Sequence, residues 1–237
     1  MSESTSGSPA APSPEADRSL NLVAIGASAG GIAALRALFE AVPEETGIAF
    51  VVVMHLSPEH ESQLAEVLQP HVKIPVRQVR ERTRIRPDQV YVIPPDRSMA
   101  VTDGHLELSE FEEPRGRRSP IDTFFRTVAE IHPDGVGILL SGSGTDGVIG
   151  LKAIKELGGI VMAQSPEDAE YDSMPRAAVA TGLVDVVLPA RALGKRVVEL
   201  RSSGRPWTLP GGPGALKDGE QQQLRKILSQ LRVRTGH

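Results

Sequence analysis

The chain has no cysteine among its 237 residues, which excludes disulfides, thiol nucleophiles and thiolate metal sites. Aromatic residues make up only 3% of it, and the formal net charge is −4. Nucleic acid is therefore not an expected partner, because the chain has no basic excess and few side chains on which bases could stack. It also lacks a run of about 18 or more apolar residues, and its N-terminus lacks the apolar core of a secretory signal. We expect no membrane insertion and a cytoplasmic location.

Short apolar runs alternate with amphipathic segments over residues 19–195, which predicts a parallel sheet covered by helices. Asp103-Gly104, between two stretches of alternating polarity, predicts an antiparallel hairpin inserted into this α/β pattern. Ser57-Pro58 and Ser119-Pro120 predict helix starts, with serine as the capping residue and proline at the first helical position.

The two ends of the chain have a different composition. Residues 1–18 consist mainly of Ser, Pro, Ala and acidic residues and are predicted to be a disordered tail. Residues 196–219 are rich in Gly, Pro and Ser and are predicted to form a linker. Residues 220–237 are predicted to form an amphipathic helix, whose apolar face would carry Leu224, Ile227, Leu228 and Leu231.

A glycine-rich turn joins a strand pattern to a helix pattern in "LNLVAIGASAGGIAALRALFEAV", residues 20–42. Such a turn can bind a phosphate at the helix N-terminus, or it can present a nucleophilic serine as a Gly-x-Ser-x-Gly elbow. A phosphate-binding P-loop needs lysine after its last glycine, but Ile32 follows Gly31. A dinucleotide site needs a glycine where Ser28 stands and an acidic residue after the second strand, where the sequence has His55. We therefore expect no cofactor and favour the serine elbow.

Ser28, His55 and Asp146 each follow a predicted strand, and groups that act on a ligand gather at the carboxyl ends of such strands. Each residue also has a structural alternative. Ser28 could cap the helix after it, His55 could bind a backbone carbonyl, and Asp146 could be the N-cap of the helix that follows it. The chain has no metal-binding His-x-x-Glu-His motif: His55, Glu59 and His60 have the wrong spacing, and Pro58 would break the helix that the motif requires. We expect no metal site.

Five blocks, in this order, resemble the catalytic domain of chemotaxis CheB-type protein-glutamate methylesterases over about residues 20–193: "VAIGASAGG", "VVVMHLSP", "VYVIPPDR", "SGSGTDGVIGLKAI" and "YDSMPRAAVATG". The resemblance implies an α/β domain with a doubly wound, mostly parallel sheet and helices on both faces. It also implies a catalytic triad of Ser28, His55 and Asp146. Ala29 replaces the threonine found in many members, so the oxyanion would be bound by backbone N–H groups at Ala29 and near Ser143.

The activity that the resemblance implies is hydrolysis of methylated glutamates on chemoreceptor helices, often with deamidation of glutamines. Arg97, Arg115 and Arg176 are candidate contacts for an acidic receptor helix, with a solvated surface role as the alternative for each. A non-catalytic scaffold of a chemosensory complex is the competing function, although the filled triad positions favour an enzyme.

The residues of the motifs "GASAGG" and "MHLSPEH" resemble the esterase part of hybrids that fuse this domain to a CheR-type methyltransferase more than they resemble the other members of the family. The end of the chain, "LRKILSQLRVRTGH", resembles the first helix of that methyltransferase's N-terminal domain. A chemotaxis methyltransferase or a histidine kinase is therefore a candidate partner. An 18-residue tail has no room for the receiver domain that precedes the esterase in chemotaxis forms, so we expect no regulation by that route.

Overall fold

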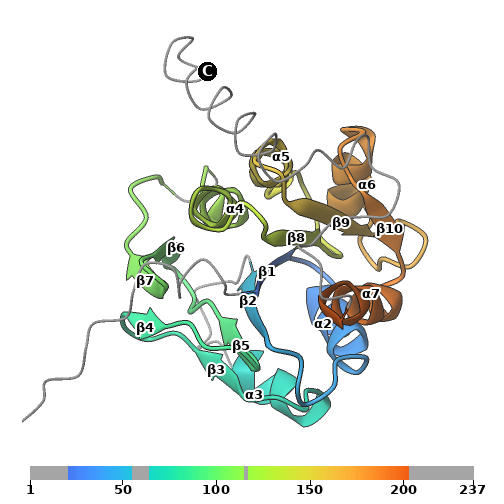
Figure 1. The fold of residues 1–237 in the computed structure, drawn as a ribbon. Coiled ribbons are helices and arrows are strands. Elements are labelled where there is room, and N and C mark those ends of the chain that lie inside the picture. Colours follow the sequence, from blue (N-terminus) through green and yellow to red (C-terminus); the bar gives the residue numbers. More distant parts are fainter. Residues whose placement is uncertain (1–20, 55–63, 115–116, 203–237) are drawn as a thin grey trace, which may run out of the picture.

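The computed structural model describes residues 21–54, 64–114 and 117–202, which form an α/β domain (Figure 1). Its main sheet has seven strands, and every neighbouring pair is parallel. From one edge to the other the strands are β10 (Val186–Leu188), β9 (Ile160–Gln164), β8 (Val136–Leu139), β1 (Asn21–Ala27), β2 (Ile48–Met54), β5 (Gln89–Val92) and β3 (Val76–Gln78). The predicted α/β fold class, with a mostly parallel sheet, is confirmed.

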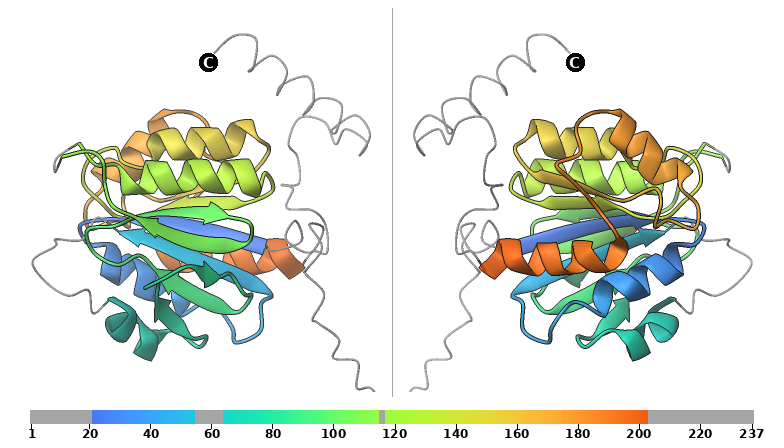
Figure 2. Two further views of the ribbon diagram at one scale, coloured as in Figure 1. Left: turned by 90° about the vertical axis from the view of Figure 1, so that its left-hand side faces the viewer. Right: turned by 90° about the vertical axis from the view of Figure 1, so that its right-hand side faces the viewer.

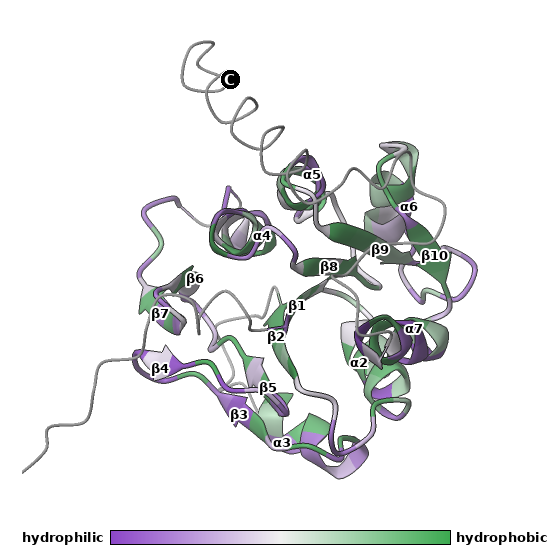
Figure 3. Cartoon of the chain, viewed as in Figure 1, coloured by the Kyte–Doolittle hydropathy of each residue, from purple (hydrophilic) through white to green (hydrophobic). Residues whose placement is uncertain are grey.

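Helices cover both faces of this sheet, as the two side views show (Figure 2). One face carries α2 (Gly31–Phe39), α3 (Leu64–Leu68), the short 3₁₀-helix η1 (Gln69–His71) and α7 (Ala190–Ser202). The other carries α4 (Pro120–Ile131), α5 (Val148–Glu156) and α6 (Ser173–Ala180). Because successive strand residues point to opposite faces, β1 packs Val23 and Ile25 into one core and Leu22 and Ala24 into the other. Burial on both faces explains why the central strands are mostly apolar, as Figure 3 shows.

The predicted hairpin is also confirmed. It consists of β6 (Ser98–Thr102) and β7 (His105–Ser109), and β4 (Thr83–Arg84) pairs with β7 in a separate three-stranded antiparallel sheet. Asp103 and Gly104 have φ values of 47° and 69°, the left-handed backbone that a two-residue hairpin turn requires. The preceding "QVYV" stretch is not part of this insertion, because it forms β5 and pairs in parallel with β2 and β3.

Several predicted boundaries need correction or fall outside the described residues. Helix α7 continues to Ser202, past residue 196 where the linker was predicted to begin, because Val197 and Leu200 are buried against the sheet. Helix α4 begins at Pro120 as predicted, but the Ser119 side chain makes no capping hydrogen bond. The predicted helix start at Ser57-Pro58, the tail and the segment 203–237 lie outside the described residues. None of the helices in the described ranges is both long and apolar enough to cross a membrane.

Candidate active site

Ser28 lies in the turn between β1 and α2, where the sequence predicts a nucleophile elbow. Its N–H donates to Ser141 O at 3.0 Å, and its carbonyl oxygen accepts from the Gly31 N–H at 2.9 Å. Both peptide groups of Ser28 are thus held, while the side chain is half-buried. The hydroxyl does not cap α2, because the N-cap residue is Gly30 and no side chain caps this helix. The structure therefore removes the capping alternative for Ser28.

Gly30 is required by both the shape and the crowding of this turn. Its φ is 69°, and a Cβ at this position would lie 2.7 Å from Ser141 Oγ and 2.9 Å from Glu170 Cβ. Real Cβ atoms do not approach other heavy atoms this closely. The elbow can therefore pack against the loops that carry Ser141 and Glu170 only if residue 30 has no side chain.

We expect Gly30→Ala to destabilise the fold more than the about 1–2 kcal/mol that left-handed backbone alone costs a residue with a Cβ. Gly182→Ala is the matched control, because Gly182 has a φ of 70° but no other group within 4 Å of the point where a Cβ would lie. Urea unfolding of the two variants measures the difference. Equal losses would mean that the packing of the elbow places no steric demand on residue 30.

The two predicted oxyanion donors, the N–H groups of Ala29 and Ser143, belong to segments that lie next to Ser28 in the structure. A trans peptide points its C=O and N–H in opposite directions, so the Ser28 carbonyl that faces Gly31 turns the Ala29 N–H away from α2. The described part of the chain offers no hydrogen-bond acceptor to the N–H groups of Ala29 and Ser143. Ser143 follows Gly142, which lies against Ser28. A Cβ built on Gly142 would be 3.1 Å from Ser28 Cβ. The two predicted donors thus lie on the two segments that meet at Ser28.

Asp146 binds the start of a helix, but not the helix that the sequence suggests. The N-cap of α5 is Gly147, without a side-chain cap, so the prediction of Asp146 as a possible N-cap of α5 is wrong. Its carboxylate accepts instead from the first N–H groups of α4: from Ile121 at 3.1 Å and from Asp122 at 2.9 Å. These donors orient the carboxylate and favour its negative charge, because helix N-termini carry positive partial charge.

The first turn of α4 joins the Asp146 loop to the end of β1. A Cβ on Gly26 would lie 2.4 Å from Ile121 Cγ2, and one on Gly147 would lie 2.6 Å from the same atom. The Ile121 side chain therefore packs against the residue two before Ser28 and against the residue after Asp146. Asp122, which is 7% exposed, fixes α4 to α5 by accepting from the Gly150 N–H at 2.7 Å.

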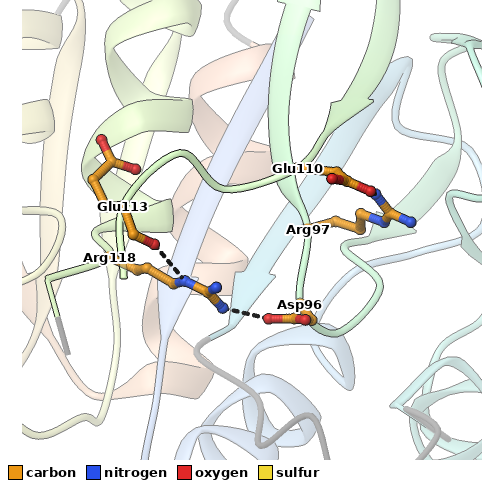
Figure 4. Close-up of polar contacts among 5 residues, drawn as sticks. All are labelled: Asp96, Arg97, Glu110, Glu113 and Arg118. Atoms are coloured by element: carbon orange, nitrogen blue, oxygen red, sulfur yellow. Dashed lines mark hydrogen bonds and ion pairs between the residues drawn. The ribbon is translucent and has the colours of Figure 1, made fainter. Parts of the chain in front are cut away.

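A polar cluster secures the segment that leads into α4 (Figure 4). Arg118 forms an ion pair with Asp96 in the loop after β5, donates to Glu113 O at 3.0 Å and lies 4.5 Å from the centre of the Phe111 ring. The Arg118 side chain is only 20% exposed, so this contact is better shielded from water than an ordinary surface pair. The cluster holds the backbone two residues before α4 begins.

Arg97 and Arg176, the predicted receptor contacts within the described residues, both make local ion pairs. Arg97 binds Glu110 at 3.1 Å, and Arg176 in α6 binds Asp172, the N-cap residue of the same helix, at 2.6 Å. These pairs agree with the surface role given as their alternative. Arg115 lies outside the described residues.

His55, together with Glu59 and His60, also lies outside the described residues. The strand before His55 is nevertheless informative, because Met54 at the end of β2 pairs with Ala27 at the end of β1. Ser28 and His55 therefore follow paired positions on neighbouring parallel strands. The role of His55 stays a prediction from the sequence.

The sequence interpretation missed two buried polar residues beside the elbow. Ser141 is 1% exposed and Gln164 is 2% exposed, and each ends an apolar run, "GVGILLS" and "GIVMAQ". A polar side chain that closes a fully buried strand must find hydrogen-bond partners. That signal could have placed both residues at the functional edge of the sheet.

Comparison with known proteins agrees with this geometry. The protein-family model described as "CheB methylesterase" matches residues 23–197. The "Protein-glutamate methylesterase/protein-glutamine glutaminase 2" of Burkholderia lata is 35% identical over 203 residues, which are 80% of this chain and 56% of that protein. A protein of Leptospira interrogans is 33% identical over 180 residues, which are 75% of this chain and 93% of that protein.

The fold matches a solved structure as well, the crystal structure of the Thermotoga maritima CheB methylesterase catalytic domain. The TM-score is 0.71 at 28% identity, and the match covers 77% of this chain and 99% of that one. Sequence and fold thus agree over the same domain, and the chain belongs to the CheB methylesterase family.

Proposed function

We propose that the chain hydrolyses glutamate γ-methyl esters of chemotaxis-type receptors, with Ser28 as nucleophile, His55 as general base and Asp146 as the acid that orients the base. The observation that carries the proposal is the approach of the Asp146 loop to the serine elbow, through Ile121 and Gly142, in a chain of the CheB methylesterase family. Membership alone would leave the site residues open. The hydrogen bonds of Ser28 and Asp146 support the assignment, because they hold both residues without using the Ser28 side chain as a helix cap.

Acylation would begin when the Ser28 hydroxyl attacks the γ-carbonyl carbon of the ester and passes its proton to His55. Neutral imidazole suits this step, since the ordinary pKa of histidine is about 6.5. The oxygen that becomes negative would accept from the N–H groups of Ala29 and Ser143. His55 would then give its proton to the departing methoxy group, so methanol leaves and an ester joins the substrate to Ser28.

Deacylation would repeat these steps with water as the nucleophile. Water would attack the acyl carbon as His55 takes one of its protons, and His55 would then give that proton to the Ser28 oxygen as the bond to Ser28 breaks. The γ-carboxyl group that leaves would lose the remaining water proton to the solvent and become a carboxylate. Asp146 would hold the imidazole in the required tautomer and balance its transient positive charge. The name of the Burkholderia relative also includes glutaminase activity. We propose the same route for receptor glutamine, with ammonia in place of methanol.

We expect the purified chain to release methanol from a methylated receptor fragment at a rate well above that of the fragment alone. Methanol is measured directly, and ammonia from a receptor fragment with glutamine at the same positions tests the second activity. Folded protein that releases no methanol would overturn the esterase proposal and favour the scaffold alternative.

A further inference from the structure

Ser141 forms hydrogen bonds with Ser28 and Ala29 of the serine elbow. Its carbonyl oxygen accepts from the Ser28 N–H at 3.0 Å, and its hydroxyl donates to Ala29 O at 2.8 Å. The same hydroxyl accepts from the Tyr171 N–H at 3.0 Å, so it both donates and accepts a hydrogen bond. The position of Ser141 therefore sets where Ser28 and the Ala29 peptide stand.

Gln164 in turn holds Ser141. Its Oε1 accepts from the Ser141 N–H at 2.8 Å, and its Nε2 donates to Asp168 Oδ2 at 2.7 Å and to Asp168 O at 3.2 Å. Asp168 is fixed too, because its Oδ2 accepts from the Ala190 N–H at the start of α7, at 2.9 Å. These partners define the orientation of the amide, since a flipped amide would set two donors against each other at Ser141.

The hydrogen bond from the Ser141 N–H to Gln164 Oε1 links the chain after β8 to β9 beyond the last register pair of these two strands. The last register pair between β1 and β8 is Gly26 with Leu139, and the last between β8 and β9 is Leu139 with Ala163. Ser141 lies beyond these pairs, whereas Gln164 is the last residue of β9 and pairs with Leu188 of β10. The Gln164 side chain thus joins the end of a paired strand to Ser141, in addition to the backbone hydrogen bonds from Leu140 N–H to Gly26 O and from Ser28 N–H to Ser141 O.

We propose that Gln164 is a positioning residue for Ser28, acting through Ser141. The inference rests on the proposed function, because it concerns the geometry of the same nucleophile. Loss of the Gln164 amide leaves the Ser141 N–H buried without its acceptor and removes one of the hydrogen bonds that hold the segment next to the elbow. A displacement of about 1 Å at a reacting group can lower a rate roughly 100-fold.

Gln164→Met tests this, since methionine has a similar volume and neither donates nor accepts strongly. We expect kcat for methanol release to fall roughly 10- to 100-fold while KM stays within about twofold, because the change moves the nucleophile and leaves the substrate-binding surface intact. Hydrolysis of p-nitrophenyl acetate, with Ser28→Ala as background, measures the nucleophile without the receptor. Methanol release from the receptor by the wild type tests the proposed function. The ratio of the Gln164→Met rate to the wild-type rate on p-nitrophenyl acetate tests the positioning role separately, so one proposal can fail without the other.

Gln69→Met is the matched control. Gln69 Oε1 accepts from the Val76 N–H at 2.8 Å, and its Nε2 donates to two carbonyl oxygens, those of Val72 and Ile74, beside the edge strand β3. Like Gln164, Gln69 accepts from a backbone N–H and donates to a backbone carbonyl, but it is exposed and lies far from the elbow in the sheet order. We expect the kcat of Gln69→Met to stay within twofold of wild type. The proposal is overturned if Gln164→Met loses folding stability but keeps kcat within twofold, or if both variants lower kcat equally.

Discussion

Ser28→Ala is expected to abolish methanol release while the fold stays intact. The change removes the hydroxyl that would form the covalent intermediate, and loss of the nucleophilic serine from a triad of this kind costs on the order of 10⁶ in kcat. The backbone bonds of residue 28 to Ser141 and Gly31 do not depend on its side chain. No helix cap is lost either, because α2 has none from a side chain.

Methanol release and thermal unfolding of the same preparation measure the two halves of this prediction. Ser202→Ala is a suitable control, because its hydroxyl donates to Val198 O in the last turn of α7, on an exposed surface. It should match the wild type in both measurements. Undiminished turnover in Ser28→Ala would remove the nucleophile assignment, whatever the family of the chain.

The fold could be predicted where a single local pattern determines it. Apolar runs that are buried on both faces predicted the strands, and Asp103-Gly104 predicted the hairpin from backbone conformation alone. The end of α7 was missed, although Leu193, Val197 and Leu200 follow helical spacing. Glycine, proline and serine dominate only after residue 202. Before it, charged residues lie between the buried apolar positions of α7, so the apolar face of the helix is difficult to recognise in the sequence.

The candidate site could be predicted only in part, because its residues interact across long stretches of sequence. Ser28 was identified from the turn that follows its own strand. The contacts of Asp146 were not predictable in this way, since the N–H groups that it binds belong to residues 24 and 25 positions earlier. Gln164 and Ser141 are likewise separated by 23 positions. Sequence spacing indicates which strand ends carry polar residues, but the packing of α4 and of β9 decides which groups these residues bind.

Asp146→Asn is expected to lower kcat on the order of 10⁴-fold, as the same change does in serine proteases, because an amide favours the wrong imidazole tautomer. The structure adds a second expected effect. Asparagine has one oxygen where the carboxylate has two, so it can serve the N–H of Ile121 or that of Asp122, but not both in the present geometry. Its NH₂ group would face the other N–H, and we expect folding stability to fall by about 1–2 kcal/mol.

Asp88→Asn is the control for exchanging a carboxylate for an amide away from the elbow. Asp88 Oδ1 accepts from the N–H groups of Thr46 and Gly47, at 2.6 and 2.8 Å, just before β2 begins and therefore at the amino ends of the strands. Because this one oxygen accepts both N–H groups, an amide at residue 88 can keep both bonds, and urea unfolding should show a smaller loss of stability than in Asp146→Asn. Only Asp146→Asn should lose methanol release. If its loss is below about tenfold, or if Asp88→Asn loses as much, Asp146 holds the start of α4 and has no part in the chemistry.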